Sequence, residues 1–165
     1  MTTLKRCGAL ALTLFAYAPA FAQEGAGNAG HAVWLDTGFA TYHFQSDKNL
    51  NGRNPGIGIE YGLSDTMALT AGRFYNSDRA HSRYAGLYYQ PWTVKGIKLG
   101  AVVGAFDGYP KMHDGGWFLA AIPAATFEYK RVGVNVAVVP NYKNRLHGGI
   151  SVQLKFKLWE SAGTP

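Results

Sequence analysis

The chain has 165 residues, a formal net charge of +6 and a single cysteine, Cys7. One cysteine excludes a framework of intramolecular disulfides. The length suits one domain. The basic residues are dispersed along the chain, which argues against a nucleic-acid-binding protein.

Residues 1–22 predict a cleaved secretory signal peptide. Lys5 and Arg6 precede an apolar run, and Ala20-Phe21-Ala22 has the pattern of a cleavage site. Cleavage would remove Cys7, which excludes a thiol enzyme, and would lower the formal net charge by two, from +6 to +4. No later apolar run approaches the ~18 residues of a membrane helix, so a membrane role would require strands.

The remaining chain has the pattern of a series of strands. Residues 23–31 are rich in glycine and alanine and predict a loose tail. Eight strand-like segments follow, at about 32–42, 55–63, 67–76, 82–91, 97–106, 117–129, 132–140 and 149–158. Most have the length of a membrane-spanning strand. The predicted barrel covers residues 32–159, and residues 160–165 predict a C-terminal tail.

The connections between these segments alternate in length. Short ones lie at 64–66, 92–96 and 130–131, and longer polar ones lie at 43–54, 77–81, 107–116 and 141–148. An even strand count with short turns at one end and longer loops at the other predicts an eight-stranded antiparallel up-and-down transmembrane β-barrel of the outer membrane. A soluble lipocalin-like barrel is the alternative.

The second segment indicates which face of the sheet is outside. One face carries Ile57, Ile59, Tyr61 and Leu63, and the other carries Gly56, Gly58, Glu60 and Gly62. Three glycines beside a carboxylate make a poor solvent face but suit the lining of a narrow lumen. The apolar face is therefore expected outside, as in a membrane barrel.

Each longer connection contains one histidine, and these are His43, His81, His113 and His147. Loop histidines are often only solvated, and no H-x-x-H or H-E-x-x-H spacing supports a metal site, so neither a metal nor another cofactor is expected. The sharpest group is His43 with Ser77 and Asp78, at the loop ends of the first and third segments. In acyl transfer, His43 could act as the base, Ser77 could supply the hydroxyl and Asp78 could supply the carboxylate that orients the base. Ser77 and Asp78 are also ordinary turn residues.

These residues resemble, thinly and over most of the chain after residue 22, the outer-membrane lipid A palmitoyltransferase family. The resemblance rests on His43 at the start of the first long loop and on Phe74-x-x-Ser77 followed by Ala85-Gly86. It implies an internal acyl pocket and transfer of an acyl chain from a phospholipid to lipid A. It also implies catalytic roles for His43 and Ser77. Asn76 stands where the family has an aspartate. Asparagine can form hydrogen bonds but carries no charge, so either Asp78 substitutes for the aspartate or catalysis is weakened, and the orienting group would be Asn76 or Asp78.

Two further features belong to this resemblance. Pro123 and Pro140 resemble a proline pair at the lateral opening of the family's barrel, because proline cannot donate to a strand ladder, although two local bends are the alternative. Tyr88, two residues after Gly86, stands where the family has a glycine at the floor of its acyl pocket. An inward Tyr88 would shorten the pocket. A long acyl chain would then lose ~0.8 kcal/mol of binding free energy for each CH₂ that is no longer buried, which predicts an acyl chain shorter than palmitate.

The predicted function is therefore acylation of lipopolysaccharide by a monomeric barrel in the outer membrane of a Gram-negative bacterium. Its partners would be phospholipid and lipopolysaccharide, with no nucleic acid and no cofactor. The alternatives are a lipid A deacylase, a non-enzymatic barrel with a structural or adhesive role, and a soluble periplasmic lipid carrier.

Overall fold

The structure, a computed structural model, describes residues 31–143 and 145–161. Its strands are β1 (Ala32–His43), β2 (Arg53–Gly62), β3 (Met67–Tyr75), β4 (His81–Val94), β5 (Ile97–Phe106), β6 (Phe118–Tyr129), β7 (Val132–Val139) and β8 (Gly149–Glu160). Two short 3-10 helices, η1 (Ser46–Lys48) and η2 (His113–Gly115), lie in the β1–β2 and β5–β6 loops. No helix in the described part of the chain is long and apolar enough to cross a membrane.

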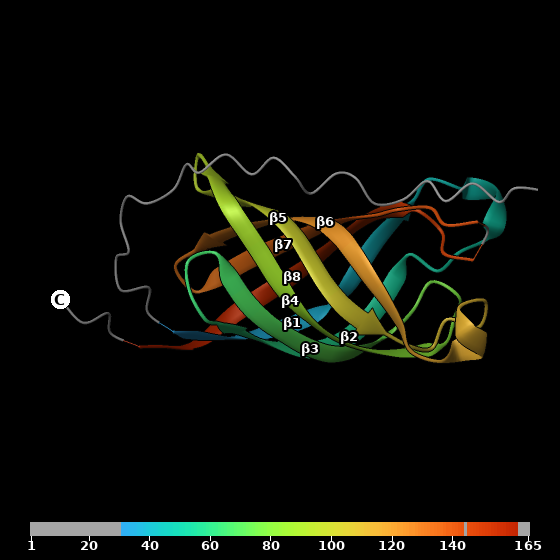
Figure 1. Ribbon diagram of the computed structural model, residues 1–165, viewed down its shortest axis with the longest axis horizontal. Helices are drawn as coiled ribbons and strands as arrows, with labels where there is room; N and C mark the ends of the chain where they lie inside the picture. Colours follow the sequence, from blue (N-terminus) through green and yellow to red (C-terminus); the bar gives the residue numbers. More distant parts are fainter. Residues whose placement is uncertain (1–30, 144, 162–165) are drawn as a thin grey trace, which may run out of the picture.

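The eight strands form one closed barrel. Each strand pairs antiparallel with the next, and β8 pairs with β1. In Figure 1 the barrel lies on its side, with the short turns at the left and the longer loops at the right. We call these the turn end and the loop end. The predicted eight-stranded antiparallel up-and-down β-barrel is confirmed.

The predicted boundaries differ from the structure by a few residues. β4 continues to Val94 because Trp92 to Val94 pair with β5 beyond a bulge, so the predicted turn at 92–96 shrinks to Lys95 and Gly96. Both turn residues have positive φ, as a tight two-residue hairpin requires. The predicted signal peptide, almost all of the N-terminal tail and most of the C-terminal tail lie outside the described residues.

Apolar side chains cover the outside of the barrel, whereas polar ones occupy much of its inside. In β2, Ile59 is half exposed while the next residue, Glu60, is only 3% exposed. In β8, Leu154 faces outward and its neighbour Lys155 is fully buried. A soluble barrel of the lipocalin type packs its apolar side chains inside, so this surface has the arrangement of a membrane barrel. The face pattern predicted for the second segment is confirmed.

A network of charged and amide side chains fills the bore between its middle and the turn end. The Lys155 ammonium forms ion pairs with Glu60 and, at 2.6 Å, with Glu128 Oε1. The side chain of Lys155 crosses Gly133 on β7, where an added Cβ would lie 2.8 Å from Lys155 Cγ. Asn135 donates to Glu60 Oε2 at 3.1 Å. These side chains close the bore, and we call them the polar plug.

The seam between β6 and β7 is only partly paired. Their ladder runs from the turn end to Ala124 and Ala137, and no further pairing joins them toward the loop end within the described residues. On the flanks, β6 pairs with β5 as far as Phe118, and β7 pairs with β8 as far as Val139. The barrel wall therefore has an open seam, which consists of residues 118–123 of β6 and 138–139 of β7.

Candidate active site

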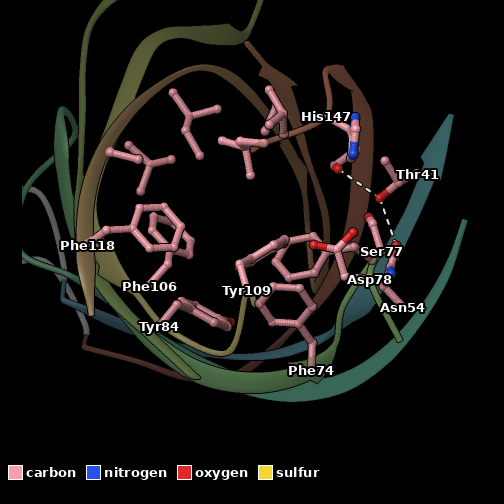
Figure 2. A pocket seen from close by; sticks show the side chains of 18 of the residues that line it. Thr41, Asn54, Phe74, Ser77, Asp78, Tyr84, Phe106, Tyr109, Phe118 and His147 are labelled. Atoms are coloured by element: carbon pink, nitrogen blue, oxygen red, sulfur yellow. Dashed lines mark hydrogen bonds between the residues drawn. The ribbon is translucent and has the colours of Figure 1, made fainter. Parts of the chain in front are cut away.

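A cavity of about 90 Å³ occupies the loop half of the bore, above the polar plug. One side is aromatic and includes Phe39, Phe74, Tyr84, Phe106 and Phe118. The opposite side is polar and includes Thr41, His43, Asn54, Ser77, Asp78, His147 and Ser151. Figure 2 shows the two sides facing each other across the empty centre. An apolar chain could lie against the first side with a reacting polar group at the second.

Glycines on β2 and β3 make room for the aromatic side. Tyr84 packs edge to face against Phe74, with ring centroids 6.0 Å apart. Its hydroxyl lies where a Cβ on Gly58 or on Gly72 would stand. A side chain at Gly58 or Gly72 would displace Tyr84. This packing explains why a glycine stands at position 58 on the inward face of the second predicted segment.

Hydrogen bonds across three strands hold the polar side in place. Thr41 on β1 donates to Asn54 Oδ1 on β2 at 2.8 Å. The same hydroxyl shares a hydrogen bond with Ser151 Oγ on β8 at 2.9 Å (Figure 2). These contacts position the strand ends from which the β1–β2 and β7–β8 loops depart, and those loops carry the histidines.

His43 ends β1 and lines the cavity. Its Nε2 lies 3.2 Å from the carbonyl oxygen of Asn51. A carbonyl only accepts, so this contact requires a proton on Nε2 and leaves the lone pair on Nδ1 when the ring is neutral. Nδ1 is buried and has no hydrogen-bond partner among the described residues. His43 is therefore a cavity residue that has one ring nitrogen, Nδ1, without a hydrogen-bond partner in the described part of the chain.

Ser77 and Asp78 also line the cavity, as the sequence predicted for a joint site with His43. On the polar side, His43 and Ser77 are connected through Asn51, whose carbonyl contacts His43 and whose N–H donates to the Ser77 carbonyl at 2.9 Å. The structure gives no hydrogen bond between His43 and the Ser77 hydroxyl within its described residues. Asp78 extends from the polar side toward Tyr109 (Figure 2). The three predicted residues thus share one cavity without forming a bonded triad.

Asn76 is 0% exposed and does not line the cavity. Its amide nitrogen donates to Ser82 Oγ at 2.9 Å and to the Gly108 carbonyl at 2.8 Å. Its amide oxygen accepts the N–H groups of Asp78 and Ala80, each at 2.9 Å. The Asn76 amide therefore ties the β3–β4 loop to β4 and to the β5–β6 loop, which in turn places Ser77 and Asp78.

His147 and Tyr109 are cavity residues that sequence reasoning did not select. His147 is 7% exposed, and its Nδ1 lies 2.6 Å from Gln45 Oε1. Burial, and after it the negative charge of Asp78, raise the pKa of Tyr109 well above its usual range, so its phenol stays protonated at neutral pH. His147 was one of four loop histidines, and no spacing in the sequence separates it from the others.

Tyr88 faces the bore and forms the floor of the cavity. It is buried and packs in one cluster with Val102, Ile122 and Ala124. Gly86 is the preceding inward position of β4 and pairs with Gly104 of β5. Tyr88 therefore lines the inner end of the cavity, together with Val102 and Ile122.

The two prolines flank the open seam. Pro123 is the last residue of β6 before its ladder with β7 begins at Ala124, and Pro140 directly follows β7. Both are exposed. Ile122 and Val139, beside them in sequence, line the cavity from the two edges of the seam. The unpaired wall and the cavity therefore adjoin each other, which is the geometry that a lateral opening needs.

The described residues contain no group of three or more histidine, cysteine, aspartate or glutamate side chains that could hold a metal ion. No protein-family profile matches the chain, and no curated protein matches it. Among solved structures, the chain is similar to the de novo designed protein TMB2.3, a transmembrane β-barrel studied by solution NMR, with 14% identity and a TM-score of 0.56. The match covers 80% of this chain and 98% of the designed one. At this identity the likeness establishes the β-barrel fold.

Proposed function

We propose that the chain is an outer-membrane enzyme that moves an acyl chain from a phospholipid to lipid A, the lipid part of lipopolysaccharide. One observation carries the proposal: an apolar cavity with a polar, histidine-containing side adjoins an unpaired seam in the barrel wall. A lipid with two or more acyl chains cannot reach an internal cavity through water, whereas a seam facing the bilayer gives one chain a path.

The outer surface supports a position in the membrane. Large apolar side chains on every strand face outward. Exposed aromatic rings stand near both ends of the barrel, with Tyr42 and Trp117 at the loop end and Trp92, Tyr129 and Trp159 at the turn end. Such rings form the interfacial girdles of membrane barrels. A signal peptide at residues 1–22 would bring the chain to the outer membrane of a Gram-negative bacterium.

In the proposed reaction, Nδ1 of His43 takes the proton from a hydroxyl group of the acceptor. The acceptor oxygen attacks the ester carbonyl of the phospholipid and forms the new ester bond. The bond to the glycerol oxygen breaks, and that oxygen receives the proton from His43. Asp78 stabilises the positive imidazolium. The hydroxyls of Ser77 and Tyr109 are donors for the oxyanion that forms at the carbonyl.

The test is the mass of lipid A from a strain that expresses the wild-type chain. The proposal predicts lipid A that is heavier by one acyl group, and this group is expected to be shorter than sixteen carbons because Tyr88 closes the cavity. Lipid A that is lighter by one acyl group would instead identify a deacylase, in which water replaces the acceptor hydroxyl. Unchanged lipid A would favour a non-enzymatic barrel and would contradict the proposal.

Replacement of Tyr88 by alanine is expected to lengthen the acyl chain that is transferred. The smaller side chain deepens the cavity, and each additional buried CH₂ adds about 0.8 kcal/mol of binding free energy. Mass spectrometry of lipid A from the Tyr88→Ala strain would show the added group shifted to longer chains. Tyr89→Ala is the matched control, because Tyr89 faces outward on the same strand. If the transferred acyl chain had the same length in Tyr88→Ala as in the wild type, the depth of the cavity would not determine the chain length.

A further inference from the structure

A second lipid-sized feature lies on the outside of the barrel, on the wall that runs from Val33 of β1 to Leu119 of β6. It is an apolar groove of about 590 Å³. Its floor is a row of small side chains, because Ala71, Ala85 and Ala105 are direct cross-strand partners on three neighbouring strands. Its sides are the larger outward residues, among them Ile59, Leu69, Val103 and Leu119. We call it the outer-wall groove.

Two arginines stand at the loop-end edge of this groove. Arg73 and Arg83 are direct cross-strand partners, and each lies two residues beyond a floor alanine on its own strand. Both are exposed. Like charges placed directly opposite each other in a sheet are destabilising, and an arginine on a lipid-facing wall is far less costly near the interface than at the membrane midplane. An anion bound between the two arginines at the interface would offset their mutual repulsion.

Neighbouring side chains orient Arg83, whereas Arg73 has no ion-pair partner among the described residues. Arg83 donates from Nε to Asp107 Oδ2 at 2.8 Å, and its guanidinium lies 5.3 Å from the Trp117 ring centroid. Its side chain nevertheless remains 69% exposed. Arg73 forms no ion pair with any residue that the structure describes. One guanidinium is thus fixed in direction, and the two arginines with Asp107 leave one net positive charge at the groove.

From this arrangement we infer that the outer-wall groove binds the acceptor lipid, with a phosphate of lipid A between Arg73 and Arg83 and an acyl chain along the alanine floor. Guanidinium groups match phosphate oxygens in both charge and geometry. The inference rests on the proposed function, because it assigns the loop end to the outer leaflet and names the docking surface of the acceptor.

The location of the groove fits this assignment. Arg73 lies on β3 four residues before Ser77, and Phe74 between them lines the cavity, so the end of β3 separates the groove from the polar side of the cavity. The open seam lies between β6 and β7, and Leu119 on the β6 edge of the seam also borders the groove. An acceptor lipid in the groove and a donor chain at the seam would therefore approach neighbouring parts of the barrel wall, with Leu119 between them.

The experiment measures binding without turnover. Purified wild-type barrel in zwitterionic detergent is titrated with bisphosphorylated lipid A, and bound lipid is counted by native mass spectrometry. We expect saturable binding that Arg73→Gln weakens about 10-fold or more, because a charge-assisted hydrogen bond is lost. Ala85→Leu, which fills the floor of the groove, is expected to weaken it as well. Arg131→Gln, at the turn end, is the control and is expected to bind as the wild type does.

Three other ligands identify the source of the phosphate. Lipid A without phosphates is expected to bind more weakly and equally well to wild type and Arg73→Gln. Inorganic phosphate is expected not to displace lipid A, and phosphatidylglycerol is expected to bind more weakly than lipid A. The inference is overturned if Arg73→Gln and Ala85→Leu bind lipid A as the wild type does. It is also overturned if phosphatidylglycerol binds equally well, or if Arg131→Gln is as impaired as Arg73→Gln.

These outcomes separate the groove from the reaction. Binding that depends on Arg73, in a chain that leaves lipid A mass unchanged in cells, would support the groove and reject acyl transfer. Acylated lipid A in cells together with binding that does not depend on Arg73 would support acyl transfer and reject the groove.

Discussion

Replacement of His43 by alanine is expected to lower the rate of acyl transfer by about 100- to 10,000-fold, the range that a general base usually contributes. The physical reason is the Nδ1 lone pair, which is fixed by the contact of Nε2 with Asn51 and has no competing partner among the described residues. The measurement is the initial rate of acyl transfer from a labelled phospholipid to lipid A by the purified barrel in detergent micelles.

The control variant is His113→Ala, since His113 is an exposed loop histidine that does not line the cavity. It is expected to transfer acyl chains at the wild-type rate. Ser77→Ala is expected to lose only about 10-fold, because Ser77 supplies one hydrogen bond and is not bonded to His43. Equal rates for wild type and a correctly folded His43→Ala variant would remove His43 from the mechanism. A loss in Ser77→Ala as large as that in His43→Ala would make Ser77 the nucleophile of an acyl-enzyme step.

Replacement of Lys155 by methionine is expected to lower the free energy of unfolding by about 3–5 kcal/mol, the usual result of removing one partner of a buried ion pair. Methionine keeps most of the length of the side chain that crosses Gly133, but it leaves Glu60 and Glu128 without their shared cation. Urea unfolding of the barrel in lipid vesicles, followed by tryptophan fluorescence, measures the change. Trp34 is a suitable probe because its ring centroid lies 4.6 Å from Lys155 Nζ.

Lys157 provides the matched control on the same strand. It pairs with Glu160 at 2.8 Å, but the side chain of Glu160 is 55% exposed, and a pair of this kind contributes at most about 1 kcal/mol. Lys157→Met should therefore change stability much less than Lys155→Met. Adding Glu60→Gln to Lys155→Met should recover part of the loss by removing the unpaired charge of Glu60, whereas Glu128 keeps its ion pair with Lys98 at 3.0 Å. If both single lysine variants unfold at the same urea concentration, Lys155 does not stabilise the bore in this way.

The strands and their faces were readable in the sequence because a barrel wall has a strict period of two. The alternation of Ile59 with Glu60 in β2 fixes which side chains face the lipid, and the same period turns Tyr88 inward. The ends of strands were less predictable. Trp92 looked like part of a turn, but pairing across a bulge extends β4 past it.

The contacts that define the interior depend on barrel closure, which local sequence does not encode. Lys155 and Glu60 are 95 positions apart, and only the pairing of β8 with β1 brings them together. The role of Asn76 was not predictable for a different reason, since its amide bonds to its own loop, to Ser82 on β4 and to Gly108. His147 becomes a cavity residue only through the folding of the β7–β8 loop.

The polar plug also has a consequence for permeability. Gln153 and Asn135 lie beside Lys155 across the bore, and each is almost completely buried. The cavity at the loop end and a polar cavity at the turn end are thereby separate compartments. A cell could carry many copies of this barrel without adding a conducting channel, so neither ions nor sugars would leak through it.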